Sequence, residues 1–282
     1  MTSWIKELPR KPIEKTSFLY ETTQAGFCSQ FNNYFYSAMY ASAKDTPLYV
    51  NDTSNAVSLR FPLIKNTFVP LKNVTFTDTN LLSAASLLAK STSQKNAGAL
   101  QMFLANVDRS QFRKVARQIL VWEPSLLESI RSRLVPDVDV GVHMRAGDKI
   151  MTHESTDIPV ETYIKALKKY QETSKKAALR VLVMTDSANR LEEFKKKKDP
   201  SWTIVNIAYP TNVNGHNQRD FNEAPRQKRM NDYLDFIAEL VVMQKARHIV
   251  CTFSSNVGRF LYLTADDTTS VVSVDMPAFA PI

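Results

Sequence analysis

The sequence predicts a mixed α/β protein with mostly parallel sheets, built as two Rossmann-like halves. In the second half, short apolar runs alternate with amphipathic stretches of helical length, which is typical of strands joined by crossover helices. The chain has 282 residues, of which 44% are apolar, and this is enough to bury a large core. Pro136 interrupts the pattern near the middle, so we expect domains at 1–136 and 137–282.

The elements of the second half follow one another with regular spacing. Apolar runs with β-branched residues predict strands, and stretches with apolar side chains on one side predict helices. The expected strands are 138–145, 179–185, 202–207, 248–253 and 271–274. The expected helices are 160–175, 188–198, 227–245 and 256–264, with a polar, asparagine-rich loop at 209–225.

The first half has a noisier α/β pattern. Strands are expected at 18–22 and 47–51, a helix at 30–43, and helical structure over most of 81–134. Two α/β halves of similar size predict a cleft between them. Open parallel sheets bind ligands beyond the carboxyl ends of their strands, so this cleft is the expected site.

Composition excludes several classes of protein. With only 6 glycines, the chain has neither a G-x-x-x-x-G-K-[ST] nor a G-x-G-x-x-G phosphate loop. Two cysteines cannot form a disulfide framework, and no apolar run has the length of a signal peptide or a membrane helix. We therefore expect a soluble, cytoplasmic protein in a reducing compartment.

The net charge of +8 favours an anionic ligand or partner. Nucleic acid is one such partner, but no aromatic residues interleave with the densest basic run, 195–198, as base stacking requires. We interpret that run as a solvated helix end and expect no nucleic-acid partner.

The strand 138–145 ends in residues suited to a diphosphate. His143 and Arg145 are spaced by two and so point to the same side, Gly147 frees the backbone to turn, and Asp148 and Lys149 follow. A guanidinium fork beside an imidazole and a lysine matches diphosphate oxygens. A His–Arg–Asp ion-pair cluster that fixes the loop explains the same spacing equally well.

A second polar group follows the strand 248–253. Ser254, Ser255 and Asn256 come where a helix begins, and a helix start offers free N–H groups and a positive dipole end to an anion. Capping of the helix alone is the commoner use of these residues. Because both groups lie at the carboxyl edge of one sheet if its strands are parallel, an anion site is favoured.

Further candidates are carboxylates. Glu239 lies among apolar residues on the helix 227–245, either as a partly buried ion-pair member or as a ligand contact. Asp52, at a strand end in the first half, is a candidate acceptor contact. Asp137 and Asp139 have the D-x-D spacing of metal-dependent transferases but lie at the entrance of a strand, so we expect no metal site.

These residues resemble a known family. Residues 141–149, Gly-Val-His-Met-Arg-Ala-Gly-Asp-Lys, are similar to the His-x-Arg-x-x-Asp-Lys segment of the α1,6-fucosyltransferases and of the rhizobial nodulation fucosyltransferases, and they also resemble the protein O-fucosyltransferases. Residues 250–259, Val-Cys-Thr-Phe-Ser-Ser-Asn-Val-Gly-Arg, closely resemble the Cys-Thr-Phe-Ser-Ser-Gln-Val-x-Arg segment of the α1,6 enzymes. Met184-Thr-Asp186 matches their Ala-Thr-Asp, and order and spacing agree over about 138–263.

The resemblance implies an inverting, metal-independent glycosyltransferase of GT-B type, without a cofactor. Its second domain, 137–282, would bind the nucleotide sugar, and the first, 1–136, would face the acceptor, an oligosaccharide or glycoprotein. Residues carried over to the donor site are His143, Arg145, Lys149, Asp186, Glu239, Thr252, Ser254, Ser255 and Asn256.

The sequence also departs from the family pattern. Ala146 replaces a second arginine of the α1,6 enzymes, and Glu239 replaces the aspartate that reads guanine. GDP-fucose is the family's donor, but a carboxylate also pairs with uracil, which leaves a UDP-pentose such as UDP-xylose open. The family's catalytic carboxylate falls at His153, with Glu154 directly after it.

An inverting transfer needs a base that deprotonates the acceptor hydroxyl and cations that stabilise the leaving diphosphate. Our hypothesis gives the base role to Glu154, with Asp148 and His153 as reserves. The alternative, favoured by the histidine at 153, is an inactive protein that binds a nucleotide sugar or a glycan.

Overall fold

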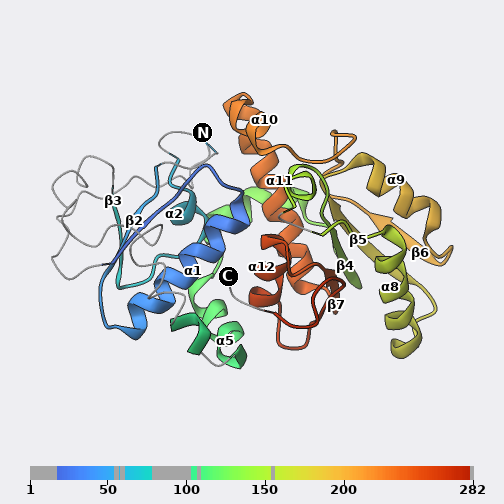
Figure 1. The fold of residues 1–282 in the computed structure, drawn as a ribbon, viewed down its shortest axis with the longest axis horizontal. Helices are drawn as coiled ribbons and strands as arrows, with labels where there is room; N and C mark the ends of the chain where they lie inside the picture. The colour runs from blue at the N-terminus through green and yellow to red at the C-terminus, as the bar shows by residue number, and fades with distance from the viewer. Residues whose placement is uncertain are drawn as a thin grey trace. The chain divides into compact units, whose positions relative to one another are not determined.

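The computed structural model describes residues 18–53, 57, 61–77, 103–106, 109–153 and 156–279. The chain divides into two compact units, one formed by Met1–Ser129 with Pro281–Ile282 and the other by Ile130–Ala280. Both units carry parallel strands joined by helices, which confirms the predicted α/β class (Figure 1).

In the first unit, the described strands form a parallel sheet in the order β1-β2-β3. Its elements are β1 (Phe18–Glu21), α1 (Phe27–Ala43), β2 (Leu48–Asn51), α2 (Leu63–Thr67), β3 (Val74–Thr77), α5 (Arg109–Ile119) and α6 (Pro124–Ile130). The sequence did not predict α2 or β3, which have only five and four residues. The helical pattern expected over 81–102 lies outside the described residues.

The second unit is a parallel sheet in the order β6-β5-β4-β7-β8, with β4 at its centre. Its strands are β4 (Val140–Met144), β5 (Leu179–Thr185), β6 (Trp202–Val205), β7 (His248–Cys251) and β8 (Ser270–Ser273). Its helical segments are η1 (Arg131–Arg133), α7 (Asp148–Met151), α8 (Val160–Ser174), α9 (Ala188–Lys197), α10 (Gln218–Glu223), α11 (Arg226–Lys245) and α12 (Asn256–Thr264). The loop predicted over 209–225 is thus wrong in part, because Asn217 caps α10 with its side chain.

Helices cover both faces of this sheet, as parallel strands require. Alternate residues of β4, among them Val142 and Met144, pack against α8 and α9 in one buried core. On the opposite face, Gly141 of β4 lies against Met243 of α11, so closely that an added Cβ would lie 2.8 Å from the methionine Cε. Since side chains alternate, His143 faces α11 and not α8.

Asp139 fixes the amino edge of the sheet. Its carboxylate accepts hydrogen bonds from the Lys176 ammonium and from the Arg180 N–H, and its backbone pairs with Arg180 and Arg247 at the starts of β5 and β7. This residue of the predicted D-x-D pair therefore ties neighbouring strands together. Among the described residues, no group of three or more His, Cys, Asp or Glu side chains is arranged to hold a metal ion.

The described helices include none that is both long and apolar enough to cross a membrane. Both cysteines, Cys28 and Cys251, are buried and unbonded to each other. The cytoplasmic location stays a prediction.

Gly258 offers a test of how tightly α12 packs on the strand that precedes it. A Cβ at Gly258 would lie 2.0 Å from the backbone oxygen of Thr252, whereas at Gly141 it would meet only the flexible side chain of Met243. We expect Gly258→Ala to lower the free energy of unfolding by more than about 2 kcal/mol, and Gly141→Ala to lower it by less. Urea unfolding followed by circular dichroism measures both, and equal losses would show that α12 can shift freely.

Candidate functional site

The register of β4 and β5 brings Arg145 and Asp186 together. Met144 pairs with Thr185 at the end of the ladder, so the next residue of each strand lies at the same edge of the sheet. The Arg145 Nη1 donates to Asp186 Oδ2 at 2.5 Å, and the N–H of Ala146 donates to the other oxygen of Asp186 at 2.9 Å. Asp186 thus holds both the guanidinium and the backbone of the turn.

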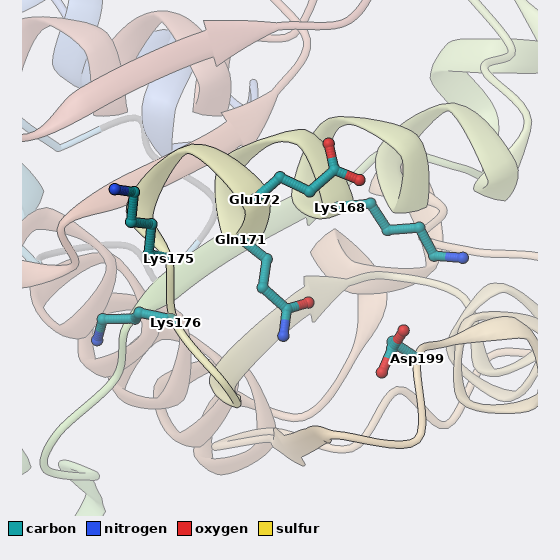
Figure 2. Close-up of a pocket in the computed structure, with 6 residues that line it drawn as sticks. All are labelled: Lys168, Gln171, Glu172, Lys175, Lys176 and Asp199. Atoms are coloured by element: carbon teal, nitrogen blue, oxygen red, sulfur yellow. The ribbon is translucent and has the colours of Figure 1, made fainter.

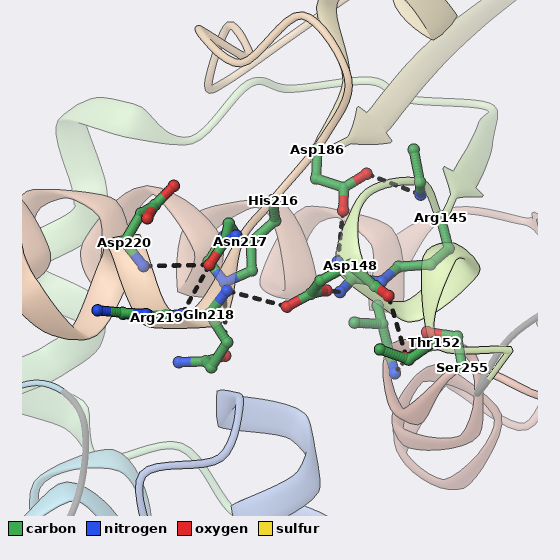
Figure 3. Close-up of polar contacts among 12 residues, drawn as sticks. Arg145, Asp148, Thr152, Asp186, His216, Asn217, Gln218, Arg219, Asp220 and Ser255 are labelled. Atoms are coloured by element: carbon green, nitrogen blue, oxygen red, sulfur yellow. Dashed lines mark hydrogen bonds and ion pairs between the residues drawn. The ribbon is translucent and has the colours of Figure 1, made fainter.

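Asp148 holds the other side of the same guanidinium. Its Oδ1 accepts from Arg145 Nη2 at 2.8 Å, and its Oδ2 accepts the N–H of Gln218 at 2.9 Å (Figure 3). The side chains of Arg145 and Asp186 are each 16% exposed, and that of Asp148 is 21% exposed. One cation between two carboxylates is a fixed, partly buried cluster with one surplus negative charge.

His143 does not join this cluster. It is buried in β4, and its Nδ1 has no hydrogen-bond partner among the described residues. Burial, and secondarily the charge of Arg145, lowers the pKa of His143 to about 3, so the imidazole is neutral. The alternative explanation by an ion-pair cluster therefore holds for Arg145 with its two aspartates, but not for His143.

The second predicted segment leaves the same edge of the sheet. β7 lies beside β4 in parallel, with Val142 opposite Val250, so Phe253 and Ser254 follow β7 at the level of Arg145. Ser255 caps α12, and its Oγ accepts the N–H of Val257 at 3.3 Å. The two stretches singled out in the sequence are therefore neighbours at one edge.

Some donors of this segment are already engaged. The N–H groups of Phe253 and Ser254 donate to the carboxylate of Asp275, at 2.8 and 3.1 Å. Thr252 is completely buried, and its hydroxyl has no hydrogen-bond partner among the described residues, so we do not retain Thr252 as a donor contact. Asp275, which sequence reasoning missed, thus occupies part of the predicted anion site. Asn256 begins α12 and is partly exposed.

Glu239 is buried in α11, where its carboxylate accepts the backbone N–H of Ala208. Burial and, to a smaller extent, the charge of Asp235 raise the pKa of Glu239 to about 8. The hydrogen bond from Ala208 acts in the opposite direction and lowers this pKa. None of the described ion pairs includes Glu239, so the first interpretation, a buried ion-pair member, is not what the structure contains.

The candidate bases lie on and after α7. Asp148 is the first residue of this short helix, and the partly exposed Lys149 is the second. His153 is exposed and has a φ of 58°. Glu154 lies outside the described residues. The structure therefore leaves the choice of base a prediction.

Asp52 requires a correction, because the structure gives it another role. It is completely buried in the first unit, and its carboxylate accepts backbone N–H groups of Leu63, Ile64 and Lys65 at the start of α2. A side chain without exposed surface cannot contact a glycan, so we do not retain Asp52 as an acceptor contact.

Sequence reasoning also missed a loop that packs against the cluster. The N–H groups of Gly147 and Asp148 donate to the backbone oxygens of Asn214 and His216, at 3.1 and 3.0 Å. Gly147 and Gly215 both have positive φ, 70° and 108°, and face each other so closely that neither has room for a Cβ. His216 is half-buried. The signal for this contact was a glycine in the polar loop of a chain that has only 6.

A cavity of about 500 Å³ lies elsewhere, near the C-terminal end of α8 (Figure 2). It is lined by charged and polar residues, namely Lys168, Gln171, Glu172, Lys175, Lys176 and Asp199. Lysines at a helix C-terminus offset the negative end of the helix dipole. Because no predicted site residue lines this cavity, we assign it no part in the chemistry.

Comparison with known proteins identifies the region that contains the cluster. The family model described as alpha-(1,6)-fucosyltransferase N- and catalytic domains matches residues 131–274. No curated protein matches in sequence.

Solved structures share the fold at low sequence identity. NodZ alpha-1,6-fucosyltransferase soaked with GDP-fucose has 11% identity and a TM-score of 0.57, and the match covers 89% of this chain and 93% of that one. Fucosyltransferase NodZ from Bradyrhizobium has 12% identity and a TM-score of 0.57, and the match covers 90% of this chain and 94% of that one. POFUT1 in complex with GDP-fucose has 10% identity and a TM-score of 0.52, and the match covers 96% of this chain and 100% of that one. The predicted GT-B-like fold is confirmed.

The buried carboxyl of Glu239 predicts a pH dependence of stability. Its pKa rises from 4.5 to about 8 on folding, so between these values the folded protein keeps a proton that the unfolded chain releases. Stability is therefore lost as the pH rises through this window, by up to about 1.4 kcal/mol per pH unit. Glu239→Gln, which mimics the protonated carboxyl, should remove that slope.

Urea unfolding without nucleotide, repeated between about pH 5.5 and 7.5, measures the slope. Glu223→Gln is the matched control, because Glu223 is an exposed carboxylate that pairs with the exposed Arg219. It should keep the wild-type slope. Identical slopes in wild type and Glu239→Gln would mean that the Glu239 carboxyl is charged in the folded protein.

Proposed function

The chain belongs to the α1,6-fucosyltransferase family, and on this premise we propose that it is an inverting, metal-independent glycosyltransferase that moves a sugar from a nucleoside-diphosphate donor to a hydroxyl of a glycan. The observation that carries the proposal is the position of Arg145. Arg145 stands at the carboxyl edge of a parallel sheet, level with the residues that lead from β7 into α12, inside the segment that the family model matches.

Charge stabilisation is the main task at such a site. As the bond from the anomeric carbon to the diphosphate breaks, negative charge grows on the leaving oxygen. Arg145 and Lys149 supply cations, and the start of α12 with Ser255 and Asn256 supplies donors and the positive end of a helix dipole, while Ser254 is held by Asp275. No metal ion is needed in this scheme.

The donor that we propose first is GDP-fucose, with which the NodZ crystal was soaked and with which POFUT1 of similar fold is in complex. Glu239 and His143 would lie by the nucleotide. Because Glu239 stands where the family uses an aspartate, a UDP-pentose such as UDP-xylose is the second candidate donor. The proposed acceptor is an oligosaccharide or a glycoprotein.

The remaining requirement is a base for the acceptor hydroxyl. The base takes the hydroxyl proton while the oxygen attacks the anomeric carbon from the side opposite the diphosphate, which inverts the configuration. We propose Glu154 for this role. Asp148 is less suited, since both its carboxylate oxygens already accept bonds from Arg145 and Gln218, and His153 remains the other reserve.

A nucleotide panel tests the donor site directly. We expect GDP or UDP to raise the melting temperature with and without EDTA, because a ligand of the folded state stabilises it by mass action. Arg145→Ala should weaken binding of the effective nucleotide at least about tenfold and should lower turnover as well, since it removes a charge-assisted contact. Lys176→Ala, which removes an ion pair at the other edge of the sheet, is the control and should bind like wild type.

The panel can also contradict the proposal. If neither nucleotide nor any of their sugars shifts the melting temperature, the protein is not a nucleotide-sugar-dependent transferase. If they bind but no transfer or hydrolysis follows, the chain is a binding protein instead.

Glu154→Gln tests the base. Removing a general base is expected to lower kcat about 10²-fold or more while the Kd of the nucleotide changes less than about twofold. His153→Gln, one residue earlier, is the matched comparison and should retain most of the turnover. A full loss in His153→Gln with normal turnover in Glu154→Gln would move the base role to His153.

A further inference from the structure

The loop that packs on the cluster is continuous with the contact of Glu239. We call residues 208–218 the strap. Its first residue, Ala208, donates its N–H to the Glu239 carboxylate, and its last, Gln218, donates its N–H to Asp148 Oδ2 at 2.9 Å. One short segment therefore bonds both to Glu239, which is proposed to lie by the nucleobase of the donor, and to the cluster proposed to lie by its diphosphate.

The two ends of the strap are anchored separately. In the middle, the backbone oxygens of Asn212 and Val213 accept the N–H groups of Ala188 and Asn189 at 2.9 and 3.3 Å, and the Ser187 Oγ donates to Val213 at 2.7 Å. These bonds fix the strap to the start of α9. A change beyond residue 213 can thus act on the cluster and leave the end at Glu239 in place.

The second end holds Asp148 and the preceding Gly147 with three hydrogen bonds. Beyond the bond from Gln218, the oxygens of Asn214 and His216 accept the N–H groups of Gly147 and Asp148. Asp148 in turn holds Nη2 of Arg145 at 2.8 Å. An arginine side chain has high rotamer entropy, and fixing it before a ligand arrives increases affinity by lowering the entropy lost on binding.

We propose that the strap is a positioning element: through the backbone N–H of Gln218 and the carboxylate of Asp148 it fixes the Arg145 guanidinium for a diphosphate. The other end of the strap, which contacts Glu239 where the nucleobase would be recognised, is anchored independently. This inference rests on the proposed function. It predicts that the strap sets affinity for the diphosphate and not for the nucleoside.

Gln218 permits a clean removal of one backbone donor. It is the first residue of α10, a position where proline is well tolerated, and the preceding Asn217 has φ −118° and ψ 118°, which a following proline allows. Gln218→Pro therefore deletes the N–H that Asp148 accepts. Gln218→Ala is the matched control, because it keeps this N–H and removes only the side-chain contacts to Asn222 and His216.

The experiment compares GDP or UDP, whichever binds wild type more tightly, with its parent nucleoside in ligand-observed NMR titrations. We expect Gln218→Pro to raise the Kd of the diphosphate about tenfold, and Gln218→Ala to change it less than about twofold. The Kd of the nucleoside should stay within about twofold in both variants, and KM for the donor should rise in Gln218→Pro. A general loss of structure would instead weaken the nucleoside equally.

Gly215→Ala provides a second variant that acts on the same end. Its Cβ would lie 2.3 Å from the Gly147 nitrogen, at a φ of 108° that alanine rarely adopts, so the strap has to leave the turn. The same selective loss of diphosphate affinity is expected. If Gln218→Pro binds the diphosphate like Gln218→Ala, or if its affinity for the nucleoside falls by the same factor as its affinity for the diphosphate, the strap has no positioning role. If wild type binds neither nucleotide, the proposed function fails first, and this inference fails with it.

Discussion

The pairing register of β4 is the constraint on which the site depends. β4 lies between β5 and β7, and its offsets to both strands place Arg145 level with Asp186 on one side and with Phe253 on the other. Since successive residues of a strand point to opposite faces, a slip of one residue would exchange the two faces of β4 and separate Arg145 from Asp186. Asp139 resists such a slip from the amino edge, because it bonds to the starts of both neighbouring strands.

Close backbone approach is the second organising feature. In a chain with only 6 glycines, Gly147 meets Gly215, and Gly258 meets the backbone of Thr252. Both contacts lie at the carboxyl edge, where loops from different strands come together. Glycine is needed there because a Cβ would push the turn after Arg145 away from the strap, and α12 away from the end of β7.

Much of the second unit could be predicted from sequence, because apolar periodicity shows strands and helices directly. The position of Arg145 and Ser255 at the same edge of the sheet followed from parallel strands, whereas the adjacency of β4 and β7 did not. The contact between the loop and the turn was not predicted, because it is made by backbone groups of Asn214 and His216, and its one trace in the sequence is the glycine between them, Gly215. Asp275 was missed for a related reason: it follows the edge strand β8, and only the sheet order brings it to Phe253. Asp52 looked like a ligand residue because a helix of five residues gives too weak a pattern to reveal the cap.

The two carboxylates beside Arg145 have a consequence for selectivity among anions. The guanidinium already has Asp148 and Asp186 as counter-ions, so an incoming anion meets a cation whose charge is already compensated. A singly charged ion gains little there, because it competes with two fixed carboxylates for the same cation. A ligand that carries several charges and is tethered by a second contact elsewhere on the protein gains more. The aspartates therefore disfavour binding of chloride and other small, singly charged ions from solution to Arg145.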